Sequence, residues 1–235
     1  MARLLLSPGQ LVSVDALVDG LYGEHPVKSA RNQVHRGVGE LRRQGVLIVE
    51  QDGSYLLNTS TEVIDAWRFK SLTESAKAAH SRDKVRLLQE ALRVWRGPAL
   101  VGLDSQVFRA AAEEWEERRL TAIQERIGAD LTLGNHNDLI PELRRLISEH
   151  PMREHFSWQL MAACYRAGRA GEAIAAFTRL REELAEQLGI DPSPELRHLY
   201  EQILRQEPVP AEETPVPRQL PPCPLKVIGR SWELE

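Results

Sequence analysis

The feature that most constrains the fold of this chain is an internal repeat with a period of 34 residues. Glycine recurs at Gly134 and Gly168, and apolar residues recur at the same spacing on both sides of these glycines. The matching pairs are Ile127 with Met161, Leu131 with Tyr165, Leu139 with Ala173, Leu143 with Phe177, and Leu146 with Leu180. Self-similarity at a fixed period of this size indicates stacked structural units.

This period is the length of a tetratricopeptide unit, two antiparallel helices joined by a short turn. The tight turn favours the glycines, and Pro151 lies where the first unit has to end, because proline cannot continue a helix. One helix pair cannot bury its apolar face alone, so such units stack and leave a surface for partners. Spacing alone leaves a generic helical bundle open as an alternative.

Apolar spacing predicts further helices before the repeat. The chain is expected to be helical from about Asp65, to be interrupted at Gly97-Pro98, and to continue as a long helix from Phe108 to Leu133. The long helix carries an acidic surface, which we interpret as a solvated face with salt bridges to Arg118 and Arg119. Its acidic residues are Glu113, Glu114, Glu116 and Glu117.

The second repeat unit is predicted to end at Gly189, and a final helix from Glu195 to Gln206 is expected to cover the exposed end of the stack. Seven of the 14 prolines then lie between Pro208 and Pro224, which indicates a linker without a packed core. The helix before Gly189 is predicted to bury one apolar stripe, formed by Ala173, Phe177, Leu180, Leu184 and Leu188.

Residues 1–58 are predicted to form three helices followed by a β-hairpin. Ser13 is the expected N-cap of the second helix, and the third starts after Ser29 and extends to about Arg43. Asp52-Gly53 lies between two β-prone runs and is a strong signal for a tight hairpin. This layout is typical of a winged helix-turn-helix, in which the third helix enters the major groove of DNA.

The third helix carries the candidate DNA contacts. With Val34, Val38 and Leu41 facing the core, a helical wheel places a set of polar and basic side chains on the opposite face and its flanks. Arginine and asparagine can bridge base edges or hold phosphates, although a charged outer face is also the ordinary solvated surface of a helix. We predict the DNA-binding residues to be Arg31, Asn32, His35, Arg36, Arg42 and Arg43.

Composition excludes several functional classes. The net charge of −4 argues against a wholly basic nucleic-acid coat, although residues 28–43 carry five Lys or Arg against one acid, Glu40. Cys164 and Cys223 form neither a disulfide framework nor a metal site, so we expect a reduced, cytoplasmic protein. No apolar run approaches the roughly 18 residues that cross a membrane, and the apolar segment near Met1 is too short for a signal peptide.

Catalysis is not expected either. The sequence has no glycine-rich phosphate loop, no serine nucleophile motif and no cluster of metal ligands, so we predict no enzyme activity, no cofactor and no metal. His150 and His155 are five positions apart with Pro151 between them, and so they do not share a helix face. Cys164 occupies a repeat-core position, where packing is its expected role.

Several runs of sequence resemble the SARP/AfsR family, the antibiotic-regulatory transcriptional activators of actinomycetes. The resemblance covers about residues 4–207. In the first part it is carried by Val14 to Gly23, Ala30-Arg31-Asn32 and Leu41-Arg42-Arg43. In the helical part it is carried by Trp95-Arg96-Gly97-Pro98-Ala99-Leu100, His150-Pro151-x-Arg153-Glu154, Tyr165 to Ala173, and Leu188 to Leu196 with its Gly-Ile-Asp-Pro-Ser-Pro-Glu-Leu run.

The resemblance implies a mainly α protein with a partial winged helix-turn-helix over 1–60 and a tetratricopeptide-like bacterial transcriptional activator domain over 61–207. Residues 208–235 would be a Pro-rich linker and the start of a possible truncated ATPase module, since Gly229-Arg230-x-x-Glu233-Leu234 is similar to the entrance of that module. The implied partners are double-stranded DNA with promoter direct repeats and the RNA polymerase holoenzyme, with a possible homodimer on DNA and no membrane.

Three features differ from the family pattern. Members normally begin with a small antiparallel sheet, whereas by comparison with the family pattern this sequence is expected to start partway through the first helix. Gly39-Glu40-Leu41-Arg42-Arg43 has an acid where the family has a basic residue, and Ser54 separates Gly53 from Tyr55. These differences keep a second hypothesis open: a helical module that binds a partner protein or a small-molecule signal, with a degenerate DNA-binding half.

Overall fold

The N-terminal part of the molecule is a small unit of three helices and a three-stranded sheet. The computed structural model describes residues 1–23 and 25–209. The strands are antiparallel in the order β1-β3-β2, so β3 is the central strand. In chain order the elements are α1 (Ala2–Leu5), β1 (Leu11–Ser13), α2 (Val14–Tyr22), α3 (Ala30–Arg43), β2 (Ile48–Gln51) and β3 (Ser54–Leu57).

Local signals in the sequence account for most of these boundaries. Ser13 caps α2 as expected, because its side chain accepts a hydrogen bond from the backbone N–H of Ala16. The β2–β3 turn falls at Asp52 and Gly53, which both have positive φ, 49° and 70°, as a tight hairpin turn requires. The predicted third helix and the predicted hairpin are thus confirmed.

Strand β1 was absent from the sequence prediction of helices followed by a hairpin. It has three residues, too few for an alternating pattern to stand out, and its burial depends on a partner far along the chain. Val12 is buried opposite Tyr55 of β3, and both side chains join the core beneath α3. The hairpin therefore becomes a three-stranded sheet.

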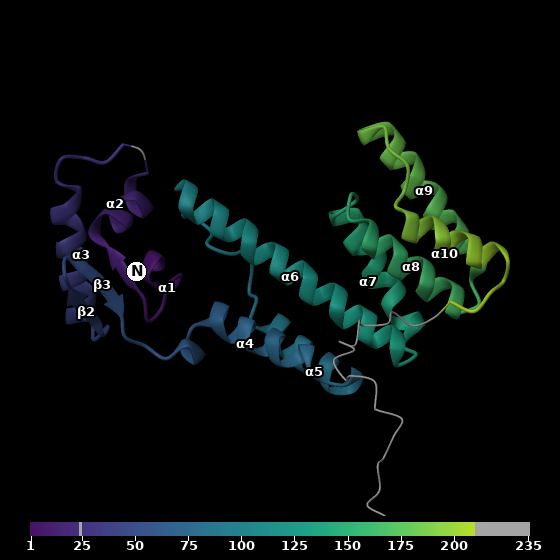
Figure 1. The fold of residues 1–235 in the computed structure, drawn as a ribbon, viewed down its shortest axis with the longest axis horizontal. Coiled ribbons are helices and arrows are strands. Elements are labelled where there is room, and N and C mark those ends of the chain that lie inside the picture. The colour runs from purple at the N-terminus through teal and green to yellow at the C-terminus, as the bar shows by residue number, and fades with distance from the viewer. Residues whose placement is uncertain (24, 210–235) are drawn as a thin grey trace, which may run out of the picture.

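The rest of the chain is helical, and Figure 1 shows it extending away from the sheet. A 3₁₀ turn at Thr61–Val63 leads into a pair of antiparallel helices, α4 and α5. Helix α5 packs along the long helix α6, and α4 reaches α6 through aromatic side chains. Helices α7 to α10 stack at the far end of α6 (Figure 1). Their bounds are α4 (Asp65–Lys77), α5 (Ser81–Arg93), α6 (Gln106–Thr132), α7 (His136–Glu149), α8 (Glu154–Arg166), α9 (Ala170–Leu188) and α10 (Pro194–Leu204).

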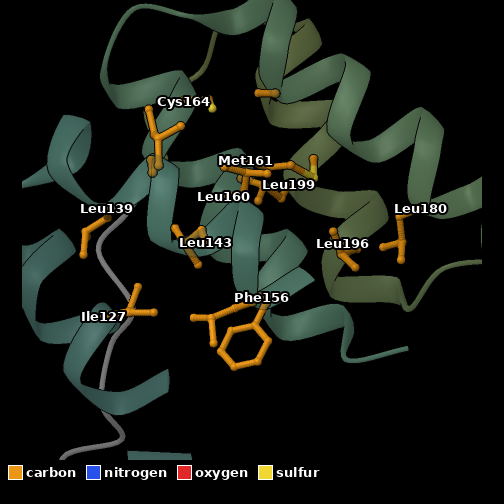
Figure 2. Packing of buried hydrophobic residues seen from close by; sticks show 14 of the residues in the cluster. Ile127, Leu139, Leu143, Phe156, Leu160, Met161, Cys164, Leu180, Leu196 and Leu199 are labelled. Carbon is orange, nitrogen blue, oxygen red and sulfur yellow. The ribbon is translucent and has the colours of Figure 1, made fainter. Parts of the chain in front are cut away.

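The 34-residue repeat corresponds to two helix pairs, α6 with α7 and α8 with α9. Gly134 and Gly168 form the two turns with φ of 89° and 75°, a conformation that favours glycine. Ile127 and Met161, one repeat apart, are both fully buried, and the paired positions on α7 and α9 are at most 5% exposed. All of them belong to one buried cluster, which includes Cys164 in the packing role predicted for it. Figure 2 shows part of this core, with Ile127, Leu143, Met161 and Cys164 labelled.

Helix α10 packs against α8 and α9 and covers the end of the stack, as expected. Its Tyr200 ring stacks on Phe177 of α9, with the ring centroids 4.2 Å apart. The predicted apolar stripe is wrong at Leu188, which is 55% exposed and outside the core cluster. It is the last residue of α9, where the helix ends at Gly189. The predicted Pro-rich linker and ATPase entrance, 208–235, lie almost entirely outside the described residues.

The sheet-containing unit contacts the helical part through α1 and α2. The indole Nε1 of Trp67 on α4 donates a hydrogen bond of 3.0 Å to the carbonyl oxygen of Leu5, and α2 contacts α6. Trp67 also packs edge-to-face on Trp115 of α6, which ties α4 and α6 together at this junction. None of the helices in the described part of the chain is both long enough and apolar enough to span a membrane.

Candidate nucleic-acid interface

Helix α3 lies on the sheet with one apolar side down and a polar side exposed to solvent. Val34 and Val38 are each 4% exposed and join the core formed by α1, α2 and the sheet. Because successive residues in a helix are about 100° apart, this fixes Asn32, Arg36 and Arg43 on the outward face. All three side chains are exposed, in agreement with the wheel.

Two of the outward side chains have no hydrogen-bond or ion-pair partner in the described part of the chain. Within residues 1–23 and 25–209, Asn32 and Arg36 make no hydrogen bond and no ion pair. They are four positions apart and therefore lie one above the other along α3. An amide and a guanidinium placed in this way present three kinds of N–H donor and one carbonyl acceptor to whatever covers the helix.

Two further arginines of α3 are held in surface ion pairs. Arg31 contacts Asp15 of α2 at 2.6 Å, and Arg43 contacts Glu40 of its own helix at 2.5 Å. All four side chains are at least half exposed, and exposed pairs of this kind contribute only about 0–1 kcal/mol. Phosphate oxygens can replace these carboxylates at little cost, so both arginines remain candidates for backbone contacts to DNA.

The remaining two predicted residues face the hairpin. The Nδ1 of His35 lies 2.6 Å from the hydroxyl oxygen of Tyr55 on β3. Arg42 donates from Nε to the carbonyl oxygen of Ile48, and its guanidinium lies over the Tyr55 ring, 5.6 Å from the centroid. Glu50 of β2 also pairs loosely with Arg42, at 3.7 Å. His35 and Arg42 thus join α3 to the hairpin.

Tyr55, which lies beneath this surface and contacts two of its residues, was missed by the sequence prediction. It is 2% exposed and lies on the inner face of the central strand. Burial, and secondarily the negative charge of Glu50, raise the pKa of Tyr55 above its ordinary value, so the phenol keeps its proton. The alternation of buried Tyr55 and Leu57 along β3 was a usable signal for its orientation, but the contact with His35 depends on how α3 crosses the sheet.

The two glycines of α3 leave its surface open. A Cβ atom at Gly37 or Gly39 would meet no atom within 4 Å apart from its own helix. Neither glycine is therefore needed for packing inside the molecule. Their cost to helix stability, about 1 kcal/mol each relative to alanine, has no compensating internal contact.

Comparisons with known proteins agree with this architecture. Residues 64–204 match the family described as Bacterial transcriptional activator domain. The chain is 36% identical to the regulatory protein DnrI of Streptomyces peucetius, over 87% of this chain and 82% of that protein. It is 34% identical to the regulatory protein AfsR of Streptomyces coelicolor over 98% of this chain, although it spans only 25% of that much longer relative.

A solved structure shows the same fold. Mycobacterium tuberculosis EmbR, in complex with a low affinity phosphopeptide, superposes with a TM-score of 0.84 at 34% identity, over 89% of this chain and 59% of that one. The fold and the matched domain define a bacterial transcriptional regulator with a winged helix and a tetratricopeptide-like helical domain. The chain belongs to the SARP/AfsR family of transcriptional regulators.

The relatives are transcriptional regulators. Among the described residues, no group of three or more His, Cys, Asp or Glu side chains is arranged to hold a metal ion. Burial raises the pKa of the Cys164 thiol, which leaves it protonated inside the helical core.

Proposed function

We propose that this protein is a sequence-specific DNA-binding activator that places α3 in the major groove of promoter direct repeats. The observation that carries the proposal is the outward face of α3, where Asn32 and Arg36 are exposed and without partners among the described residues. Asparagine pairs naturally with the N6 and N7 edge of adenine, and arginine with the O6 and N7 edge of guanine. Arg31 and Arg43 would hold the flanking phosphates.

The hairpin supports the same function. Strands β2 and β3 lie beside the C-terminal half of α3, tied to it by the Arg42–Ile48 hydrogen bond. The hairpin tip at Asp52-Gly53 would reach the phosphate backbone next to the groove that α3 occupies. We propose that two protomers bind two direct repeats as a homodimer, so that their α3 and hairpin surfaces lie on one side of the duplex.

The helical domain, 61–207, would supply the activating contact with RNA polymerase holoenzyme. Stacked repeats expose a continuous surface of α6 to α10 while burying one core, an arrangement suited to protein partners. By family membership we propose that the genes under control belong to a secondary-metabolite, antibiotic-type cluster. The protein would act in the cytoplasm without a cofactor.

A titration of the purified chain with promoter duplexes tests DNA binding. Fluorescence anisotropy with a labelled fragment from upstream of its own gene cluster, against a shuffled duplex of equal length, should show tighter binding to the promoter. Because phosphates contribute to the affinity, the logarithm of the binding constant should fall linearly with the logarithm of salt concentration. If the folded protein binds neither duplex at low salt, the proposal is wrong.

One observation favours a second candidate, a helical interaction module with a weakened DNA-binding half. Arg31, Arg42 and Arg43 already have carboxylate partners, and one of these, Glu40, is on α3 itself. Glu40 also places negative charge near the proposed phosphate positions. This candidate predicts that the protein binds a partner protein through the repeat surface, and that its affinity for promoter and shuffled duplexes is equally weak.

A further inference from the structure

The buried hydroxyl of Tyr55 links the central strand β3 to helix α3. In the described part of the chain, its contact with His35 is the only hydrogen bond between side chains of these two elements. Its oxygen lies 2.6 Å from Nδ1 of His35, and the two rings meet edge-to-face at 5.9 Å. Tyr55 is 2% exposed, whereas His35 is exposed on the flank of the proposed DNA surface. The pair thus links a rigid core position to a surface position.

The hydrogen bond with Tyr55 determines which nitrogen of the His35 ring carries the proton and can donate a hydrogen bond to solvent or to a partner. A neutral imidazole has one N–H donor and one bare nitrogen acceptor. The buried phenol keeps its proton, and a buried O–H without an acceptor is costly, so the hydroxyl proton is directed at Nδ1. Glu50, opposite Tyr55 on the neighbouring strand, is a second acceptor close to the phenol and contributes to raising the pKa of Tyr55, and its carboxylate also pairs loosely with Arg42 at 3.7 Å. The short 2.6 Å contact of the hydroxyl is with Nδ1 of His35. With Nδ1 accepting from Tyr55, the proton of the imidazole is on Nε2.

We propose that Tyr55 is a positioning residue that fixes His35 as an Nε2–H donor toward DNA. The proposal rests on the proposed DNA-binding function and adds a role that the surface residues alone do not show. The acceptor of this donor would be an oxygen or nitrogen of the duplex, either a base edge such as guanine O6 and N7 or a phosphate oxygen. Tyr55 itself would not touch the DNA.

The Arg42 contact strengthens the link without replacing it. Arg42 lies over the Tyr55 ring and donates to the Ile48 backbone, so removing the ring would disturb the hairpin as well as His35. The hydroxyl oxygen alone is therefore the atom to remove. Tyr55→Phe keeps the buried ring, the edge-to-face packing and the cation–π contact while deleting the hydrogen bond to His35.

The first test needs no DNA. Long-range proton–nitrogen NMR spectra of the histidine rings distinguish the Nε2–H from the Nδ1–H tautomer, and a His35→Ala variant assigns the signal. In the wild type the neutral His35 ring should be the Nε2–H form, and in Tyr55→Phe it should become a mixture. A wild-type ring that is Nδ1–H, or that is unchanged by Tyr55→Phe, would overturn the proposal even if the protein binds DNA.

The second test is a double-mutant cycle on promoter binding. Tyr55→Phe and His35→Ala should each weaken binding to the promoter duplex by about 3- to 10-fold, the size of one lost hydrogen bond. The double variant should be no weaker than His35→Ala alone, because Tyr55 acts through His35. Losses that add in full would overturn the positioning role. A wild type that fails to bind any duplex instead contradicts the proposed function and leaves the NMR result to stand by itself.

Two further readouts make the cycle decisive. Tyr22→Phe is the matched control, because it also removes a phenol hydroxyl that contacts α3, at Gln33, but on the side away from the hairpin. It should leave promoter binding unchanged. The salt dependence separates the two acceptors: a lower salt slope in His35→Ala indicates a phosphate, whereas an unchanged slope with reduced discrimination against the shuffled duplex indicates a base edge.

Discussion

The buried arginine of the helical domain, Arg126, and the outward arginine of α3, Arg36, are used in opposite ways. On α6, Arg126 is 8% exposed and bridges Asp130 at 3.0 Å and Glu142 of α7 at 2.7 Å, inside the first repeat unit. On α3, Arg36 is exposed and unpaired within the described residues, and Arg31 pairs at the surface. Arg126 thus holds α6 and α7 together, whereas Arg36 is available to a partner.

The largest expected effect is on stability and comes from the buried arginine. Arg126→Ala would leave Asp130 buried without its counter-charge and should lower the free energy of unfolding by about 3–5 kcal/mol, measured by chemical denaturation. Arg145→Ala is the control, because it breaks an exposed pair with Glu149 that contributes at most about 1 kcal/mol. Equal losses of unfolding free energy in the two variants would contradict the structural role that we assign to the buried ion pairs of Arg126.

The next effect is on recognition and leaves stability unchanged. Asn32→Ala removes an exposed, unpartnered amide, so its denaturation curve should match the wild type. Discrimination between promoter and shuffled duplexes should fall by about 1–3 kcal/mol, the value of one good base contact. Arg36→Ala tests the neighbouring position by the same anisotropy assay. Full discrimination in both variants would show that the outward face of α3 does not read bases.

Two glycine substitutions compare a helical glycine of α3, Gly37, with a glycine that has positive φ in the repeat turn, Gly134. Gly37→Ala should raise the free energy of unfolding by about 1 kcal/mol, because the position is inside α3 and an added Cβ meets nothing nearby. Gly134→Ala has the same chemistry but lies at φ of 89° in the repeat turn, so it should destabilise. The measurement is paired thermal denaturation, and a stabilised Gly134→Ala would contradict the assigned role of that turn.

The smallest expected effect concerns the acid on the recognition helix. Glu40→Gln removes the ion-pair partner of Arg43 and one negative charge near the proposed phosphates. DNA affinity should rise a few-fold, and the slope of binding against salt should steepen by up to about 0.9, as for one additional phosphate contact. Affinity that falls in Glu40→Gln would show that Glu40 positions Arg43 for binding rather than competing for it.

The sequence was sufficient for features that depend on local pattern. The repeat glycines, the Ser13 cap, the bounds of α3 and the Asp52-Gly53 turn all follow from short-range steric and hydrogen-bonding rules. Strand β1 and the exposure of Leu188 were mispredicted, because each depends on which distant segment lies alongside. Burial is decided by the partner and not by the residue type alone.

The candidate site was predictable in its residues but not in their roles. Periodicity placed Asn32, His35 and Arg36 outside the core, and all three are exposed. Which of the basic residues would be engaged by carboxylates depends on contacts between α3 and its neighbours. Asp15 is 16 positions from Arg31, and Tyr55 is 20 positions from His35, so no helical spacing rule connects them.

The central claim is that the chain meets DNA through α3 and the hairpin. The most direct measurement follows backbone amide NMR signals of the labelled protein during titration with a promoter duplex at moderate salt. We predict that the largest changes occur in α3 and the β2–β3 hairpin, and that α7 to α10 remain unaffected. Changes confined to the repeat helices, with α3 unaltered, would contradict the account.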